Sequence, residues 1–128
     1  MTDSRNLTES REQTRHELLE RRMRTFAANV IRTLDTHKAL HRSLTDQLTR
    51  SAASIGANYA EACNAVSKQD FRNKIFIAKK EAAETRYWID LCSDLSSPAD
   101  WISLRKESHE LLVILQTIVN TLSGKSAK

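Results

Sequence analysis

The residues best suited to chemistry in this chain are its four histidines, His16, His37, His41 and His109. A metal site in a helical protein needs histidines and carboxylates at helical spacing, such as Glu-x-x-His on facing helices. His37 and His41 are four residues apart, but they flank an expected turn and have no carboxylate at helical spacing. The sequence therefore predicts no metal site and no cofactor.

A second pattern with chemical potential is arginine followed by histidine about four to six residues later, which occurs in some four-helix nucleases. Arg11 to His16 and Arg32 to His37 both fit this pattern. The chain is rich in arginine, so about one such match is expected by chance. Neither histidine has an evident partner acid. A cryptic ribonuclease that uses Arg32 and His37 therefore stays an alternative, and we expect no enzyme.

Two carboxylates, Glu61 and Glu84, could form a pair for general acid–base work. Glu61 ends a polar line on one expected helix, after Arg50, Ser54 and Asn58. Networks of this kind fix the register and orientation of packed helices. We therefore expect a structural polar network of Arg50, Ser54, Asn58, Glu61 and Glu84, and no catalytic residues.

The composition predicts an all-α protein. The 128 residues include two Gly and one Pro, and aromatic residues make up 5%. Such a chain has few turn residues and little β signal. We expect a polar tail at residues 1–13, an up-down-up-down antiparallel four-helix bundle at 14–123 and a C-terminal tail at 124–128. The expected helices begin at Thr14, near Ser43, after Ser67, and after Ser97 with Pro98 in the first turn. Gly124 is expected at the end of the last helix.

The stretch from Arg42 to Val66 carries three faces, where a surface helix needs only two. The apolar stripe contains Leu44, Leu48, Ile55, Tyr59, Ala62 and Val66, and a seam of small residues contains Ala53, Gly56, Ala57 and Ala60. We expect this helix to touch more than one neighbour, with a close backbone approach at Gly56. Cys63 and Cys92 are expected to be core thiols in a reducing cytoplasm. No apolar run is long enough to cross a membrane.

Basic residues form a line on the third expected helix. Lys68, Arg72, Lys79 and Arg86 fall within about 40° of one another on the helical wheel. Phe76 and Tyr87 flank that line, so the group could follow a phosphate backbone. The net charge of +4 permits such a ligand without requiring it. Arg21 and Arg24, on the first expected helix, are secondary candidates for nucleic-acid binding.

Three segments resemble, in the correct order, motifs of one bacterial family. SAASIGANYAEA at residues 51–62 resembles R-A-a-x-S-I-x-A-N-I-A-E-G, SKQDF at 67–71 resembles S-K-x-D-F, and ETRYWI at 84–89 resembles E-T-x-Y-W-L. These are motifs of the four-helix-bundle proteins encoded in intervening sequences of large-subunit ribosomal RNA genes. Ala62 departs from the usual Gly, and Gly56 stands where Pro often occurs.

The resemblance implies a homopentameric ring of antiparallel four-helix bundles with no established enzymatic activity. Accessory proteins of diversity-generating retroelements share this architecture and bind nucleic acid and a reverse transcriptase through a basic surface. We therefore expect a cytoplasmic, non-enzymatic oligomeric scaffold that binds RNA or DNA. The alternative is a scaffold for an acidic protein partner or a reverse transcriptase.

Overall fold

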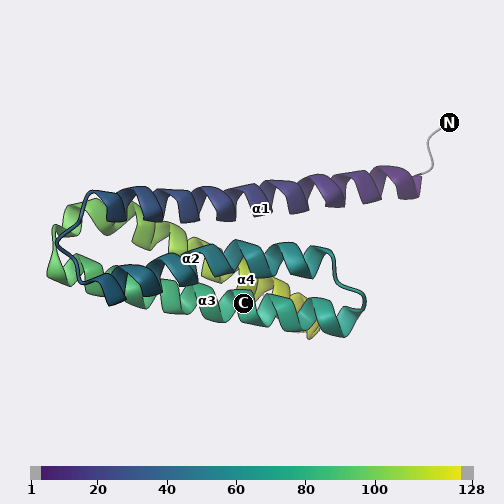
Figure 1. Ribbon diagram of the computed structural model, residues 1–128. Coiled ribbons are helices and arrows are strands. Elements are labelled where there is room, and N and C mark those ends of the chain that lie inside the picture. The colour runs from purple at the N-terminus through teal and green to yellow at the C-terminus, as the bar shows by residue number, and fades with distance from the viewer. Residues whose placement is uncertain (1–3, 125–128) are drawn as a thin grey trace.

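The computed structural model describes residues 4–124 and is an antiparallel bundle of four long helices (Figure 1). The elements are α1 Ser4–Asp35, α2 Arg42–Cys63, α3 Lys68–Leu95, the 3₁₀ turn η1 Pro98–Trp101, and α4 Ile102–Leu122. No strand occurs in this part of the chain. The all-α prediction is confirmed, and none of the described helices is long and apolar enough to cross a membrane.

Each helix packs mainly against its neighbours in the sequence. α2 with α3 is the most extensive pair, followed by α3 with α4 and α1 with α2, whereas α1 and α4 touch over a smaller area. α1 and α3 therefore lie across the bundle from each other. The core consists of one apolar side chain from nearly every helical turn, and its largest members are Trp101, Tyr59, Phe26 and Met23.

The first helix begins earlier than the sequence suggested. α1 starts at Ser4, so Thr14 lies inside the helix and its hydroxyl donates to the carbonyl of Ser10 at 2.9 Å. The helix start expected at Thr14 is therefore wrong. Residues 6–15 are exposed throughout, and this part of α1 runs beyond the neighbouring helices (Figure 1).

The second helix begins near Ser43, as expected, whereas the start of the fourth helix differs from the prediction. α2 begins at Arg42, and the cap is the ring of His41, whose Nδ1 accepts from the backbone N–H of Ser43 at 3.2 Å. Ser97 precedes η1, with Pro98 in its first turn, and makes no side-chain cap hydrogen bond. The polar group that matters there is Ser96: its Oγ accepts from Trp101 Nε1 at 2.9 Å and fixes the buried indole.

The predicted cap at the start of α3 and the predicted glycine at the end of α4 are both confirmed. Ser67 caps α3, since its side chain accepts from the N–H of Asp70 at 3.0 Å while Asp70 accepts from Val66 N at 3.3 Å. Gly124 follows α4 with a φ of +71°, a conformation that glycine adopts without strain.

The seam of small residues on α2 faces α1. A Cβ at Gly56 would lie 3.2 Å from Met23 Cβ, so the predicted close approach is confirmed. Two expectations for the end of this helix are wrong. Val66 is 94% exposed because α2 ends at Cys63, and Cys63 is itself exposed. Cys92 is buried, and burial raises the pKa of its thiol to about 11.

α1 is tied to α4 by an ion-pair cluster. Arg22 Nη2 lies 2.6 Å from Glu107 Oε1 and 2.7 Å from Glu110 Oε2. The hydrogen bond from Arg22 lowers the pKa of Glu107. This contact borders an open groove of about 480 Å³ between the two helices. The sparse packing of α1 on α4 therefore depends on charge as well as on apolar contact.

We predict that Gly56→Val destabilises the bundle by about 1–3 kcal/mol, because the added methyl groups collide with Met23 on α1. The matched control is Ala83→Val on the exposed side of α3, which should change stability by about 0.5 kcal/mol or less. Urea denaturation followed by circular dichroism measures both. Equal effects of the two substitutions would contradict a close helix approach at Gly56.

Candidate nucleic-acid interface

The basic residues predicted on α3 lie along the edge of that helix that faces α4. We call Lys68, Arg72, Lys79 and Arg86 the α3 basic line. Arg72 Nη2 lies 3.5 Å from Ser123 Oγ at the end of α4, and Arg86 Nη1 donates to His109 Nδ1 at 3.0 Å. These two contacts place the line beside α4, with Lys79 between them and Lys68 exposed at the start of α3.

The second helix of this surface supplies further cations. A groove of about 550 Å³ between α3 and α4, called here the α3–α4 groove, is bordered by both basic and apolar side chains. Its lining residues are Arg86, Ile102, Arg105, Lys106, His109 and Glu110. The members on α4 were not predicted, because a groove between two helices does not show in the pattern of either helix alone. The available signal was the spacing of Ile102, Lys106, His109 and Val113, which repeats every three or four residues and marks one face of α4.

The two acids at the groove are already paired. Arg105 Nε lies 2.7 Å from Asp90 Oδ1, and Glu110 binds Arg22. Within residues 4–124, no acidic side chain pairs with Lys79, Arg86 or Lys106. The surface thus keeps an excess of positive charge that its own carboxylates do not neutralise.

An aromatic ring also accompanies the α3 basic line. The guanidinium carbon of Arg72 lies 5.6 Å from the centroid of the Phe76 ring, a cation–π contact. Tyr87, which follows Arg86, is 61% exposed. The Tyr87 ring meets that of Trp88 on the side of α3 toward α2, so Phe76 is the aromatic residue that contacts the α3 basic line.

The secondary candidates on α1 lie elsewhere. Arg21 borders the groove between α1 and α4, and Arg24 borders a smaller groove of about 260 Å³ between α1 and α2. Because α1 and α3 lie across the bundle from each other, neither arginine joins the α3 basic line.

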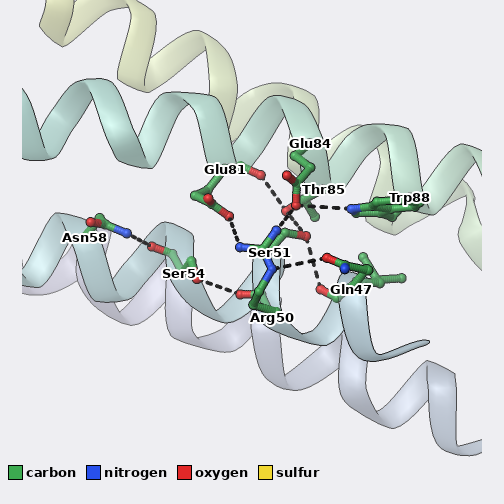
Figure 2. A network of polar contacts seen from close by, with 10 residues as sticks. Gln47, Arg50, Ser51, Ser54, Asn58, Glu81, Glu84, Thr85 and Trp88 are labelled. Atoms are coloured by element: carbon green, nitrogen blue, oxygen red, sulfur yellow. Dashed lines mark hydrogen bonds and ion pairs between the residues drawn. The ribbon is translucent and has the colours of Figure 1, made fainter. Parts of the chain in front are cut away.

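The polar line of α2 meets α3 at an ion-pair network (Figure 2). Arg50 donates to Glu84, and its Nη1 donates to Glu81 Oε2 at 3.0 Å. Trp88 Nε1 donates to Glu84 Oε2 at 3.2 Å. Glu81 was not predicted, although its spacing of three residues from Glu84 puts both carboxylates toward the same neighbour.

The other predicted network residues have different partners. Ser54 Oγ donates to the carbonyl of Arg50 at 2.7 Å, and Asn58 Nδ2 donates to the carbonyl of Ser54 at 2.8 Å, both within α2 (Figure 2). Glu61 does not approach Glu84 and instead binds Lys74 Nζ at 2.8 Å. Ser54 and Asn58 thus bond within α2, and Glu61 joins α2 to α3. Glu61 and Glu84 do not form the carboxylate pair of an acid–base site.

A buried pair of hydroxyls lies beneath that network. Thr85 Oγ1 lies 2.9 Å from Ser51 Oγ, and both residues are fully buried. The Thr85 hydroxyl also lies 2.7 Å from the carbonyl of Glu81. These bonds satisfy the polar atoms that α2 and α3 bury against each other.

The remaining histidines have separate structural partners. His37 Nε2 lies 3.0 Å from Asp100 Oδ2, so the chain does provide this ring with an acid. Arg32, however, donates to Asn29 at 3.0 Å and makes no contact with His37 in the described residues. No group of three or more His, Cys, Asp or Glu side chains there could hold a metal ion.

His16 of α1 joins Tyr59 of α2 rather than a neighbouring arginine. Its Nδ1 lies 2.6 Å from the Tyr59 hydroxyl. Burial, followed by the proximity of Cys63, raises the pKa of that hydroxyl above its usual range. The contact joins the two helices with a neutral phenol, and it gives no nucleophile at ordinary pH.

The chain is similar to proteins that have been described before. The family described as 23S rRNA-intervening sequence protein matches residues 18–117. A crystal structure of a protein with unknown function from the S23 ribosomal protein family of Bacteroides thetaiotaomicron is 32% identical, with a TM-score of 0.70. The match covers 79% of this chain and 97% of that one. None of the curated proteins matches the chain. Neither of these descriptions assigns an enzymatic activity.

We predict that Arg50 and Glu81 are energetically coupled by about 0.5–1 kcal/mol, since Glu81 has a side chain only 18% exposed and binds the guanidinium directly. The measurement is a double-mutant cycle of Arg50→Gln and Glu81→Gln by urea denaturation.

The matched control cycle uses Arg42→Gln and Asp46→Asn, a pair with highly exposed side chains 3.9 Å apart. Its coupling should be smaller, and it should vanish in high salt. Equal coupling in the two cycles would show that the network contributes no more than an ordinary surface pair.

Proposed function

This chain belongs to the 23S rRNA-intervening sequence protein family, and we propose that it is a non-enzymatic, homo-oligomeric scaffold that binds RNA or DNA. The binding surface of the proposal is the α3 basic line together with the α3–α4 groove. The observation that carries it is that Arg86 and Lys106, cations from two helices at one groove, pair with no carboxylate among the residues that the structure describes. Phosphate backbones are recognised by such surfaces through charge and counterion release.

The spacing along α3 favours an extended polyanion. Arg72, Lys79 and Arg86 recur every seven residues, which is about 10.5 Å along a helix. A regular row of positive charge suits a polymer that carries a negative charge on every unit. This is the reason to favour nucleic acid over an acidic protein or a reverse transcriptase as the partner.

Self-association would strengthen weak binding by each subunit. The groove between α1 and α2 exposes Ala53 and Ala57, small residues that allow a helix of another subunit to approach closely. Each chain carries a net charge of +4, so a ring of several copies would present repeated basic faces. The proposed oligomer is a homopentamer.

We predict that Lys79→Glu combined with Arg86→Glu abolishes binding of a fluorescent RNA oligonucleotide in low salt while the helical circular dichroism stays unchanged. Both side chains lie on the α3–α4 face and outside the buried core. For the unmodified protein, the logarithm of the binding constant should fall linearly with the logarithm of the salt concentration.

The control for total charge is Lys38→Glu combined with Arg42→Glu, at the connection between α1 and α2. Its binding should fall much less than that of the α3 variant. If both double variants lose affinity equally, the net charge acts without a defined surface. Affinity that does not change with salt would contradict electrostatic binding.

The oligomeric part of the proposal has its own measurement. Native mass spectrometry should give five copies of the 14.6 kDa chain. Ala57→Glu should reduce the assembly to smaller species without unfolding the helices, because a charge would be buried in the subunit contact. A monomer as the main species of the unmodified protein would overturn the oligomeric scaffold and leave the nucleic-acid surface to be judged by the binding assay.

A further inference from the structure

Two arginines of the bundle use the same atoms differently. The Nε and Nη2 atoms of an arginine direct their hydrogens the same way and form a fork that fits two oxygens of a carboxylate or a phosphate. At Arg22 this fork is filled, because Nε lies 2.8 Å from Glu107 Oε2 and Nη2 lies 2.6 Å from Glu107 Oε1. At Arg86 neither atom has a partner within residues 4–124, although Nη1 donates to His109 Nδ1 at 3.0 Å. The fork of Arg86 is therefore open to an anion from outside the chain.

The two carboxylates at this groove are engaged by other arginines. Asp90, one turn after Arg86 on α3, lies 2.7 Å from Arg105 Nε. Glu110, which lines the α3–α4 groove, lies 2.7 Å from Arg22 Nη2. The chain thus fills the fork of Arg22 with its own side chains and leaves the fork of Arg86 unfilled. An anion that entered the groove could bind Arg86 without displacing a carboxylate from it.

His109 restrains the guanidinium of Arg86. An arginine can only donate hydrogen bonds, so His109 Nδ1 accepts the bond from Arg86 Nη1, and the hydrogen of the neutral ring lies on Nε2. Because this bond uses Nη1 alone, it holds the side chain without occupying Nε or Nη2. A side chain that is already held loses less conformational entropy when it binds a ligand. His109 therefore favours anion binding through Arg86, without touching the anion.

A second cation borders the same groove. Lys106 lies about one turn before His109 on α4, lines the α3–α4 groove together with Arg86, and has no ion pair in the described part of the chain. A backbone phosphate can offer its two non-bridging oxygens to the arginine fork and its negative charge to the ammonium group. The groove thus presents two kinds of cation, from two helices, to one anion.

We propose that the open fork of Arg86 binds a backbone phosphate of the nucleic acid, with Lys106 as the second cation and His109 as the residue that positions the fork. This inference rests on the proposed nucleic-acid function and names the contact that anchors the ligand. Binding by a fork depends on the shape of the guanidinium, so it goes beyond the general attraction of a basic surface. Phosphate contacts fix the position of a nucleic acid and do not read its sequence, so we expect no sequence preference from this site.

The first test keeps the charge of Arg86 and removes its fork. Arg86→Lys should weaken the binding of a fluorescent RNA oligonucleotide about fivefold or more, because an ammonium group cannot bind two oxygens side by side. Fluorescence anisotropy in low salt measures the affinity. The matched control is Arg42→Lys, the same change on an exposed side chain at the start of α2, and it should leave the affinity unchanged. A loss in Arg86→Lys that is no larger than the loss in Arg42→Lys would overturn the fork.

The second test separates positioning from charge. His109→Ala removes the acceptor and should lower the affinity about threefold, whereas His109→Asn puts an amide oxygen close to the position of Nδ1 and should restore most of the loss. Arg86→Gln should reduce the slope of the logarithm of the binding constant against the logarithm of salt concentration by about one. His109→Ala should leave that slope unchanged, because it removes no phosphate contact. A reduced slope in His109→Ala, or no recovery in His109→Asn, would overturn the positioning role.

The outcomes distinguish this inference from the proposed function. Salt-dependent binding that does not need the fork of Arg86 would overturn the inference and keep the nucleic-acid function. If no oligonucleotide binds in low salt, the function is wrong, and inorganic phosphate then tests the fork alone. The probe is the unfolding temperature in sodium phosphate and in sodium chloride of equal ionic strength, for the unmodified protein and for Arg86→Lys.

The general effect of phosphate on protein stability is the same in these two proteins, so their difference reports the fork. A rise in phosphate that is larger for the unmodified protein than for Arg86→Lys would keep the fork as a phosphate site and overturn nucleic acid as its ligand. Equal rises in the two proteins, together with no oligonucleotide binding, would overturn both the fork and the function.

Discussion

The packing of α2 against α3 is the constraint on which the rest of the structure depends. At its centre the buried hydroxyls of Ser51 and Thr85 lie 2.9 Å apart, and at its surface Arg50 bridges Glu81 and Glu84 (Figure 2). Sliding one helix along the other would leave these polar groups buried or half-buried without partners, at a cost of several kcal/mol. The pair therefore fixes both the register and the rotation of α3. That rotation decides which residues of α3 face α4.

The residues that match the family motifs and the candidate binding residues largely occupy different edges of α3, although Lys68 of the SKQDF segment belongs to the α3 basic line. Ser51 and Thr85 belong to the segments that resemble family motifs, and both are used inside the bundle. Arg86 lies beside Thr85 in the sequence but turns toward α4. The recognisable motifs thus specify how the helices assemble. The charge that could serve a ligand lies on residues whose types alone are not distinctive.

Helix interiors could be predicted from sequence because burial every three or four residues is a strong signal, and Ser67 could be predicted because its cap is local. The missed features depend on other parts of the chain. Ser97 precedes the 3₁₀ turn η1 and makes no side-chain cap, while the neighbouring Ser96 accepts from Trp101, which lies five residues further along the chain. Glu81 and Lys106 were not predicted, and His109 was considered only as a metal ligand, because these roles appear only when two helices are placed side by side.

The arrangement of the helices makes the two parts of the proposal compatible. The small residues Gly56 and Ala57 lie in the groove between α1 and α2, whereas Arg86 and Lys106 lie in the α3–α4 groove across the bundle. A subunit contact at the first groove would not cover the second. It would also bury little charge, since the groove between α1 and α2 is mainly alanine, glycine and methionine, with Glu20 and Arg24 at its border. Repulsion between the basic faces of neighbouring subunits would then be relieved by a bound polyanion. Assembly and nucleic-acid binding would consequently support each other, because the ligand neutralises the charge that opposes association.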